Sequence, residues 1–142
     1  MLVLMRHAKS AYPPQTPDHD RPLSDRGRRN AAAARSWLIE HDVVPTRALI
    51  SSAQRTRETW QILDFDERCS VHWLPELYLA DAATIVALSQ GQDPMGTTLI
   101  LGHNPGMHEA AEQIGGCAIE RFPTSAIAIC DAQGLRDFVV PR

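Results

Sequence analysis

An arginine and a histidine stand side by side near the start of the chain, as Arg6-His7 in the stretch MRHAKS. Positions 1–5 before them are apolar, which predicts a strand buried on both faces, and charged side chains at its end are out of place in a core. His103 follows the apolar stretch TTLILG, and Arg55 lies in SSAQRTRET. Two guanidinium groups and two imidazoles brought together would bind a small dianion such as phosphate, whose oxygens accept their hydrogen bonds.

Strands and helices that alternate along the chain must bring these four residues together. Apolar runs predict strands over 1–5, 47–51, 70–74 and 97–102, and a closing hairpin over 125–130 and 135–140. Helical patterns occupy 25–41, 53–63, 81–90 and 103–114. The alternation predicts an α/β fold, a single-domain three-layer sandwich over 1–142 whose mainly parallel sheet has an antiparallel edge strand.

Three helix starts carry local signals. Ser24 is a predicted N-cap, Ser51 and Gln54 fit the capping box S-x-x-Q, and Asn104 is a predicted cap with Pro105 at the first helical position. The proline-rich stretch AYPPQTPDHDRPL predicts a loop. In such a sheet, ligands bind beyond the carboxyl ends of the strands, where helix N-termini favour anions, so the two arginines and two histidines are expected on one rim.

Composition excludes several classes of protein. The chain has 142 residues, enough for one domain with a sizeable core, and a net charge of -3, which argues against a nucleic-acid partner. Its three cysteines include no CxxC pair for zinc or redox chemistry. The apolar start is too short for a signal peptide or a membrane span, so a cytoplasmic location and no membrane partner are expected. We expect no metal or other cofactor, because no Asp/His cluster with ligand spacing occurs.

The motif MRHAKS resembles the signature of the histidine phosphatase superfamily, and DRPLSDRG, SSAQRTRET, PELYLA and GHNPG follow in that family's order. With the short length and the stretch FPTSAIA, the pattern is similar to the small phosphohistidine phosphatases of the SixA type, over essentially the whole chain. The resemblance implies a phosphoglycerate mutase-like fold. Ala8 stands where the wider superfamily usually has glycine, and there is no room for the helical subdomain that covers the pocket of larger members. We therefore expect an open site.

The resemblance also implies roles for the four rim residues. His7 would be the nucleophile that attacks phosphorus and becomes phosphorylated, through one neutral ring nitrogen. Arg6 and Arg55 would bind the non-bridging oxygens of the phosphate, and His103, protonated beside the dianion, would be a third charged donor.

Five further residues are weaker candidates. Lys9 and Ser10 either reach the phosphate or form a turn, and Arg21 either binds substrate or makes an ion pair with Asp20. Glu76, in LPELY, aligns with the stretch where larger relatives carry the proton donor, but it also fits an ordinary carboxylate at a strand end. Asn104, next to His103, is a candidate substrate-binding residue.

The favoured function is a phosphatase acting on phosphohistidine in a protein, such as a histidine phosphotransfer domain. The alternative is a phosphatase of small phosphate esters or anhydrides on the same scaffold, and a third is a non-catalytic phosphate-binding protein. An open groove suits a protein surface, whereas a small metabolite is better bound by a lidded pocket that excludes water.

Overall fold

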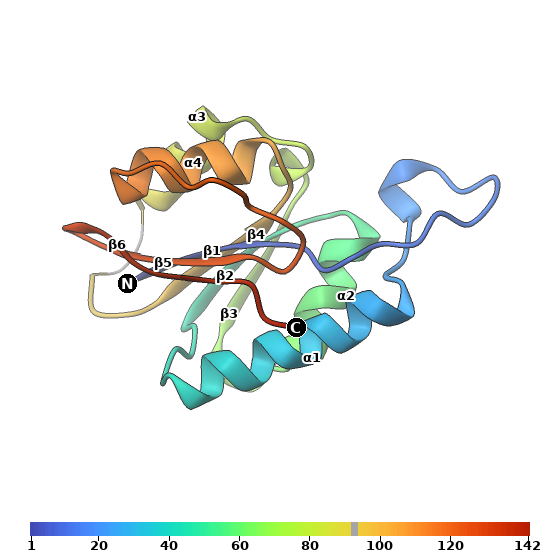
Figure 1. Cartoon of the computed structure of the whole chain (residues 1–142), viewed down its shortest axis with the longest axis horizontal. Coiled ribbons are helices and arrows are strands. Elements are labelled where there is room, and N and C mark those ends of the chain that lie inside the picture. The colour runs from blue at the N-terminus through green and yellow to red at the C-terminus, as the bar shows by residue number, and fades with distance from the viewer. Residues whose placement is uncertain (92–93) are drawn as a thin grey trace.

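A mixed sheet of six strands forms the centre of the computed structural model, which describes residues 1–91 and 94–142 (Figure 1). The strand order is β3-β2-β4-β1-β5-β6. Neighbours among β3, β2, β4 and β1 are parallel, whereas β5 pairs antiparallel with β1 and with β6. The strands are β1 (Leu2–Arg6), β2 (Arg47–Ser51), β3 (Ser70–Leu74), β4 (Thr98–Gly102), β5 (Ile127–Asp131) and β6 (Gly134–Val139).

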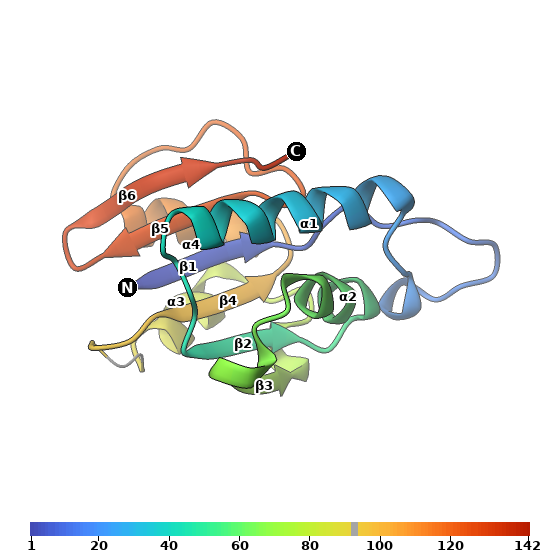
Figure 2. The same ribbon diagram turned by 90° about the horizontal axis from the view of Figure 1, so that it is seen from below.

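Helices cover both faces of the sheet. One pair, α1 (Asp25–Glu40) and α2 (Gln54–Leu63), lies on the face turned to the viewer in Figure 2, and the other pair, α3 (Ala82–Ser89) and α4 (Gly106–Gly115), lies on the opposite face. This confirms the predicted α/β sandwich of three layers with an antiparallel edge. None of the helices in the described part of the chain is long and apolar enough to span a membrane.

The central strands are buried on both faces. In β1, Leu2 and Leu4 pack into the core under α3 and α4, and Val3 and Met5 pack into the core under α1 and α2. A strand with two buried faces requires apolar side chains at every position, which is why β1 is a continuous apolar run. The polar group that follows such a strand is thereby fixed at the edge of a rigid sheet.

The starts of three helices only partly match the local sequence signals. Ser24 caps α1 as predicted, because its hydroxyl accepts the N–H of Gly27. The predicted capping box at Ser51 is wrong: α2 begins after Ala53 without a side-chain cap, and Ser51 is the last residue of β2. Pro105 is the N-cap of α4 rather than its first helical residue.

The loop after β1 contains one helical turn. This turn, η1 (Asp18–Asp20), lies in the proline-rich stretch that projects from the body of the molecule (Figure 1). An isolated β-bridge between Ser10 and Leu23 closes the base of the loop. After the loop, the chain at Gly27 passes close to Lys9, where the loop begins. A Cβ atom on Gly27 would overlap the carbonyl oxygen of Lys9. Only glycine allows this approach, which holds the start of α1 against the residues that follow His7.

Candidate active site

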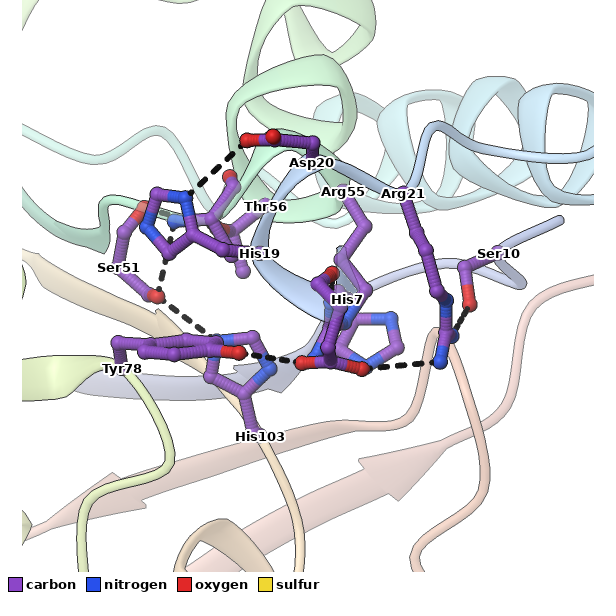
Figure 3. A network of polar contacts seen from close by, with 12 residues as sticks. His7, Ser10, His19, Asp20, Arg21, Ser51, Arg55, Thr56, Tyr78 and His103 are labelled. Atoms are coloured by element: carbon purple, nitrogen blue, oxygen red, sulfur yellow. Dashed lines mark hydrogen bonds and ion pairs between the residues drawn. The ribbon is translucent and has the colours of Figure 1, made fainter. Parts of the chain in front are cut away.

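The four predicted rim residues line one pocket of about 200 Å³. Arg6 and His7 leave β1, His103 leaves the parallel neighbour β4, and Arg55 lies in the first turn of α2. Arg6 pairs in register with Gly102, and the rings of His7 and His103 are therefore neighbours, with centroids 5.2 Å apart (Figure 3). The pocket is further lined by Lys9, Ser10, Tyr12, Arg21, Leu79, Asn104 and Thr124.

His7 is held as a neutral ring with one free nitrogen. Its Nδ1 lies 2.6 Å from the carbonyl oxygen of Ala8, and because that oxygen only accepts, Nδ1 carries the proton and Nε2 keeps its lone pair. Burial lowers the pKa of His7 to about 3, and the charges of His103, Arg55 and Arg6 add to this effect against the opposing Ala8 hydrogen bond. The His7 ring is therefore uncharged at neutral pH, and its Nε2 lone pair is available.

The backbone next to His7 is tied to the helix that carries Arg55. The hydroxyl of Thr59 accepts the N–H of Ala8 at 3.1 Å and donates to the carbonyl oxygen of Arg55 at 2.7 Å. Thr59 is completely buried. This link fixes the distance between the end of β1 and α2, and with it the distance between His7 and the guanidinium of Arg55.

His103 is held by a serine that the sequence assigned to a helix cap. Its Nε2 lies 2.7 Å from Ser51 Oγ, while its Nδ1 is buried without a partner. Ser51 Oγ also accepts the N–H of Ala53, and in the tautomer in which its own hydrogen points to His103 Nε2 the ring proton lies on Nδ1. Burial, followed by the charge of Arg55, lowers the pKa of His103 to about 3. The imidazolium expected at His103 is therefore a neutral imidazole in the structure.

Buried nitrogen atoms without partners are concentrated in this pocket. Among the described residues, six buried side-chain atoms lack a hydrogen-bond partner, and four of them belong to pocket residues: Arg6 Nε, Arg21 Nε, Arg55 Nε and His103 Nδ1. Leaving one buried polar group unpaired costs about 1–3 kcal/mol. The side chains that carry these nitrogens line the cavity, and their N–H groups are donors of the kind that an oxyanion with several acceptor oxygens would satisfy.

Asp18 orients two of the guanidinium groups and was not found from the sequence. Arg55 donates to the backbone oxygen of Asp18 at 2.8 Å and to its carboxylate at 3.1 Å, and Arg21 donates to the same carboxylate at 3.0 Å. The hydroxyl of Tyr78 donates to this carboxylate as well (Figure 3). The Tyr78 hydrogen bond, followed by the Arg55 contact, lowers the pKa of Asp18, so the carboxylate is ionised.

The weaker candidates around His7 have different positions. Lys9 is exposed at the pocket, and Ser10 is buried and accepts a hydrogen bond from Arg21. The alternative ion pair between Arg21 and Asp20 is wrong, because the η1 turn places the carboxylate of Asp18, three residues earlier, beside the guanidinium. Arg21 thus lines the pocket and is fixed from two sides.

Asn104 lines the pocket, but its side-chain amide hydrogen-bonds to backbone groups. Its amide nitrogen donates to the carbonyl oxygen of Phe122 at 2.7 Å, and its oxygen accepts the N–H of His108 in the first turn of α4. It therefore satisfies one helix donor as a cap would, although α4 starts two residues later. Arg6 also donates to the Phe122 oxygen, at 3.3 Å.

The structure does not bring Glu76 into the pocket. Glu76 lies in the turn η3 (Pro75–Leu77), where the buried Leu77 faces the core and Glu76 is exposed. It is not among the residues that line the cavity. The residue of this segment that reaches the polar network is Tyr78, through Asp18. No group of three or more metal-binding side chains occurs within residues 1–91 and 94–142.

Comparison with known proteins agrees with this geometry. The family model described as "Histidine phosphatase superfamily (branch 1)" matches residues 2–78, more than half of the chain. An uncharacterized protein of Mycobacterium tuberculosis is 34% identical over 141 residues, which cover 92% of this chain and 88% of that protein.

Solved structures show the same fold. The protein proposed to be the phosphohistidine phosphatase SixA of Agrobacterium tumefaciens is 30% identical, with a TM-score of 0.89 over 99% of this chain and 97% of that one. The protein histidine phosphatase SixA, solved with tungstate, is 24% identical, with a TM-score of 0.83 over 99% and 96% of the two chains, and shows the fold alone. The chain therefore belongs to the histidine phosphatase superfamily and is a phosphatase.

Proposed function

We propose that this phosphatase removes the phosphoryl group from a phosphorylated histidine of a protein, through a phosphorylated His7. The observation that carries the proposal is the pocket itself. It combines a neutral histidine, whose Nε2 is free, with four buried nitrogens that lack partners. Phosphoryl transfer needs an in-line nucleophile and donors for the equatorial oxygens, and little else from the protein.

The reaction proceeds in two displacements. In the first, the lone pair of His7 Nε2 attacks phosphorus, the bond from phosphorus to the substrate's imidazole nitrogen breaks, and the departing ring keeps the bonding pair and takes a proton. In the second, water attacks the phosphorus of phospho-His7, its proton passes to solvent, and inorganic phosphate leaves with His7 restored. Arg6 and Arg55 donate to the equatorial oxygens throughout, and the Ala8 carbonyl accepts the Nδ1 proton of His7.

His103 changes its charge when the anion binds. The ring is neutral in the structure because burial, followed by the charge of Arg55, lowers its pKa to about 3. A phosphoryl dianion next to Nδ1 acts in the opposite direction and raises that pKa, since a nearby negative charge favours the protonated ring. His103 then donates through Nδ1 while Ser51 holds Nε2. The protonated His103 expected from the sequence is in this proposal the state of the loaded pocket.

We assign the protonated His103 to the phosphate oxygens, so the lack of a carboxylic acid for the leaving group favours phosphohistidine over alkyl phosphates. None of the described residues that line the pocket is a carboxylic acid, and the nearest one in the network, Asp18, is ionised. Expelling an alkoxide needs a proton donor, whose contribution is typically 10²- to 10⁴-fold. Imidazole leaves more easily because it already carries a proton or takes one from water. The same pocket therefore acts on phosphohistidine without the help that an ester requires.

The test is a comparison of kcat/KM among substrates. We would use a histidine phosphotransfer domain phosphorylated chemically with phosphoramidate, free phosphohistidine, and a panel of sugar and nucleotide phosphates. Both phosphohistidine substrates are expected to exceed every ester by at least about 100-fold. Tungstate, an oxyanion that the same donors fit, is expected to compete with substrate. A sugar or nucleotide phosphate that is hydrolysed faster than phosphohistidine would overturn the proposal.

A further inference from the structure

Two large apolar side chains stand exposed at the mouth of the phosphate pocket. Tyr12 is 74% exposed and Leu79 is 57% exposed, and both line the cavity. Single exposed apolar residues are common on protein surfaces. These two are distinguished by their shared position and by the way in which the surrounding structure fixes each of them.

Leu79 is held in an unfavourable backbone conformation. Its φ angle is 52°, in the left-handed region that a branched side chain rarely adopts. Both sides of the residue are anchored: the Tyr78 hydroxyl donates to Asp18, and the carbonyl oxygen of Ala80 lies so close to Gly106 that a Cβ there would overlap it. The side chain remains 57% exposed, so packing into the core does not account for the conformation. A strained residue at a site points to a role in function.

Tyr12 is exposed but fixed in place. The guanidinium of Arg21 lies 3.9 Å from the centre of its ring, a cation–π contact. Arg21 in turn donates to Asp18 and Ser10. The ring is therefore positioned by the same arginine that reaches the pocket. A fixed aromatic ring gives contact area to a partner at a low cost in conformational entropy.

The size of the pocket places most of the substrate outside it. Sites that enclose a drug-sized ligand typically have about 300–1,000 Å³, whereas this one has about 200 Å³. The phosphoryl group and the ring that carries it fill such a space, and the remainder of the substrate must lie on the rim. Beside the two apolar residues, Lys9 is exposed on this rim and makes no ion pair within the described residues.

We propose that Tyr12 and Leu79 form an apolar docking rim for a protein segment in which apolar side chains flank the phosphorylated histidine and an acidic side chain meets Lys9. This inference rests on the proposed function and adds the surface by which a protein substrate is recognised. The rim contacts the residues around phosphohistidine and leaves the phosphoryl group to the pocket. It therefore raises kcat/KM for a phosphoprotein more than it raises kcat/KM for free phosphohistidine.

The experiment compares rim variants on two substrates. Leu79→Gly and Tyr12→Ser would be assayed with the chemically phosphorylated histidine phosphotransfer domain and with free phosphohistidine. Each variant is expected to lower kcat/KM for the phosphoprotein by about tenfold, the order of the effect of burying part of one such side chain. Because both residues also line the pocket, the readout is the ratio of kcat/KM for the phosphoprotein to kcat/KM for free phosphohistidine, which is expected to fall several-fold in each variant. Glycine accepts the φ angle at position 79, so Leu79→Gly is expected to keep or raise the melting temperature.

Two further variants control for stability and for general surface effects. Leu79→Asn tests the apolar contact with a residue that also tolerates the left-handed region, and it is expected to behave like Leu79→Gly. Ile39→Ala removes an apolar side chain of similar exposure, 42%, from α1 away from the pocket, and is expected to change neither substrate.

The outcomes separate the rim from the reaction. If both substrates lose activity equally, or neither does, the docking rim is wrong while phosphohistidine hydrolysis stands. If the wild type hydrolyses neither phosphohistidine substrate, the proposed function fails, and the rim fails with it. A selective loss on the phosphoprotein in both Leu79 variants supports the rim.

Discussion

Replacing Ser51 by alanine tests how the second histidine is held. The substitution removes the hydroxyl that lies 2.7 Å from His103 Nε2 and also accepts the N–H of Ala53. Ser51 is 0% exposed and His103 is 3% exposed, so water does not replace the lost partner. An unpaired buried polar group costs about 1–3 kcal/mol, and the free energy of unfolding should fall by that amount.

Ser51→Ala should also lower kcat/KM, by more than its loss of folding stability would explain. Without Ser51, Nε2 of His103 loses the hydroxyl that fixes the ring and that can accept its second proton, so Nδ1 is no longer held toward the anion that it contacts in our proposal. We expect kcat/KM for free phosphohistidine to fall by about 10- to 100-fold, equivalent to about 1.4–2.7 kcal/mol of transition-state stabilisation. The ¹⁵N shifts of the His103 ring should show a change in tautomer, a readout that a purely structural role would not move.

The neighbouring serine supplies the control. Ser52 also contacts a histidine through its hydroxyl, at 2.9 Å from His19 Nε2, but His19 is not among the residues that line the pocket. Ser52→Ala should change kcat/KM less than twofold. The reasoning is refuted if Ser51→Ala keeps kcat/KM within twofold of the wild type with an unchanged tautomer, or if Ser52→Ala loses as much.

Three other predictions follow from the site. Arg55→Ala should lower kcat/KM by more than about 100-fold, near 3 kcal/mol, in steady-state assays. Arg57→Ala, a change on the exposed face of the same helix, should have little effect. A decrease of less than tenfold in Arg55→Ala would contradict the role of Arg55. The pKa of His7 and of His103 is about 3 in the folded protein and near 6.5 in the unfolded chain. Between pH 3 and about 6.5 the unfolded chain therefore binds more protons than the folded protein. Urea titrations should then show unfolding free energy that falls as the pH drops from about 6.5 towards 3, by up to roughly 1.4 kcal/mol per unit for each histidine, and a constant value would refute this. Glu76→Gln should leave kcat/KM for phosphohistidine within twofold, because Glu76 is exposed outside the pocket; a large loss would make it the proton donor after all.

The positions of the four central residues could be predicted because they depend on the sheet. An apolar run without interruption indicates a strand buried on both faces, and the carboxyl ends of parallel strands meet at one edge. His7 and His103 follow two such runs, β1 and β4, and lie side by side as expected. The family motifs pointed to the same residues. The apolar patterns of β1 and β4 were therefore sufficient to predict that His7 and His103 lie together.

The network around these residues could not be predicted, because its contacts join distant parts of the chain. Ser51 fits a local capping pattern, but its hydroxyl contacts a histidine 52 positions away. Asp18 contacts Arg55 across 37 positions and Tyr78 across 60. The pairing of Arg21 with Asp18 instead of Asp20 depends on the η1 turn, which a proline-rich stretch does not reveal.

Trapping the phosphorylated enzyme shows whether His7 is the residue that receives the phosphoryl group. The wild type would be mixed rapidly with the phosphorylated histidine phosphotransfer domain, quenched in alkali to preserve phosphohistidine, and mapped by mass spectrometry. We predict an acid-labile phosphate on His7, and neither phosphate nor turnover in a folded His7→Ala variant. A phosphate on another residue of the wild type, or turnover that persists in His7→Ala, would contradict the account.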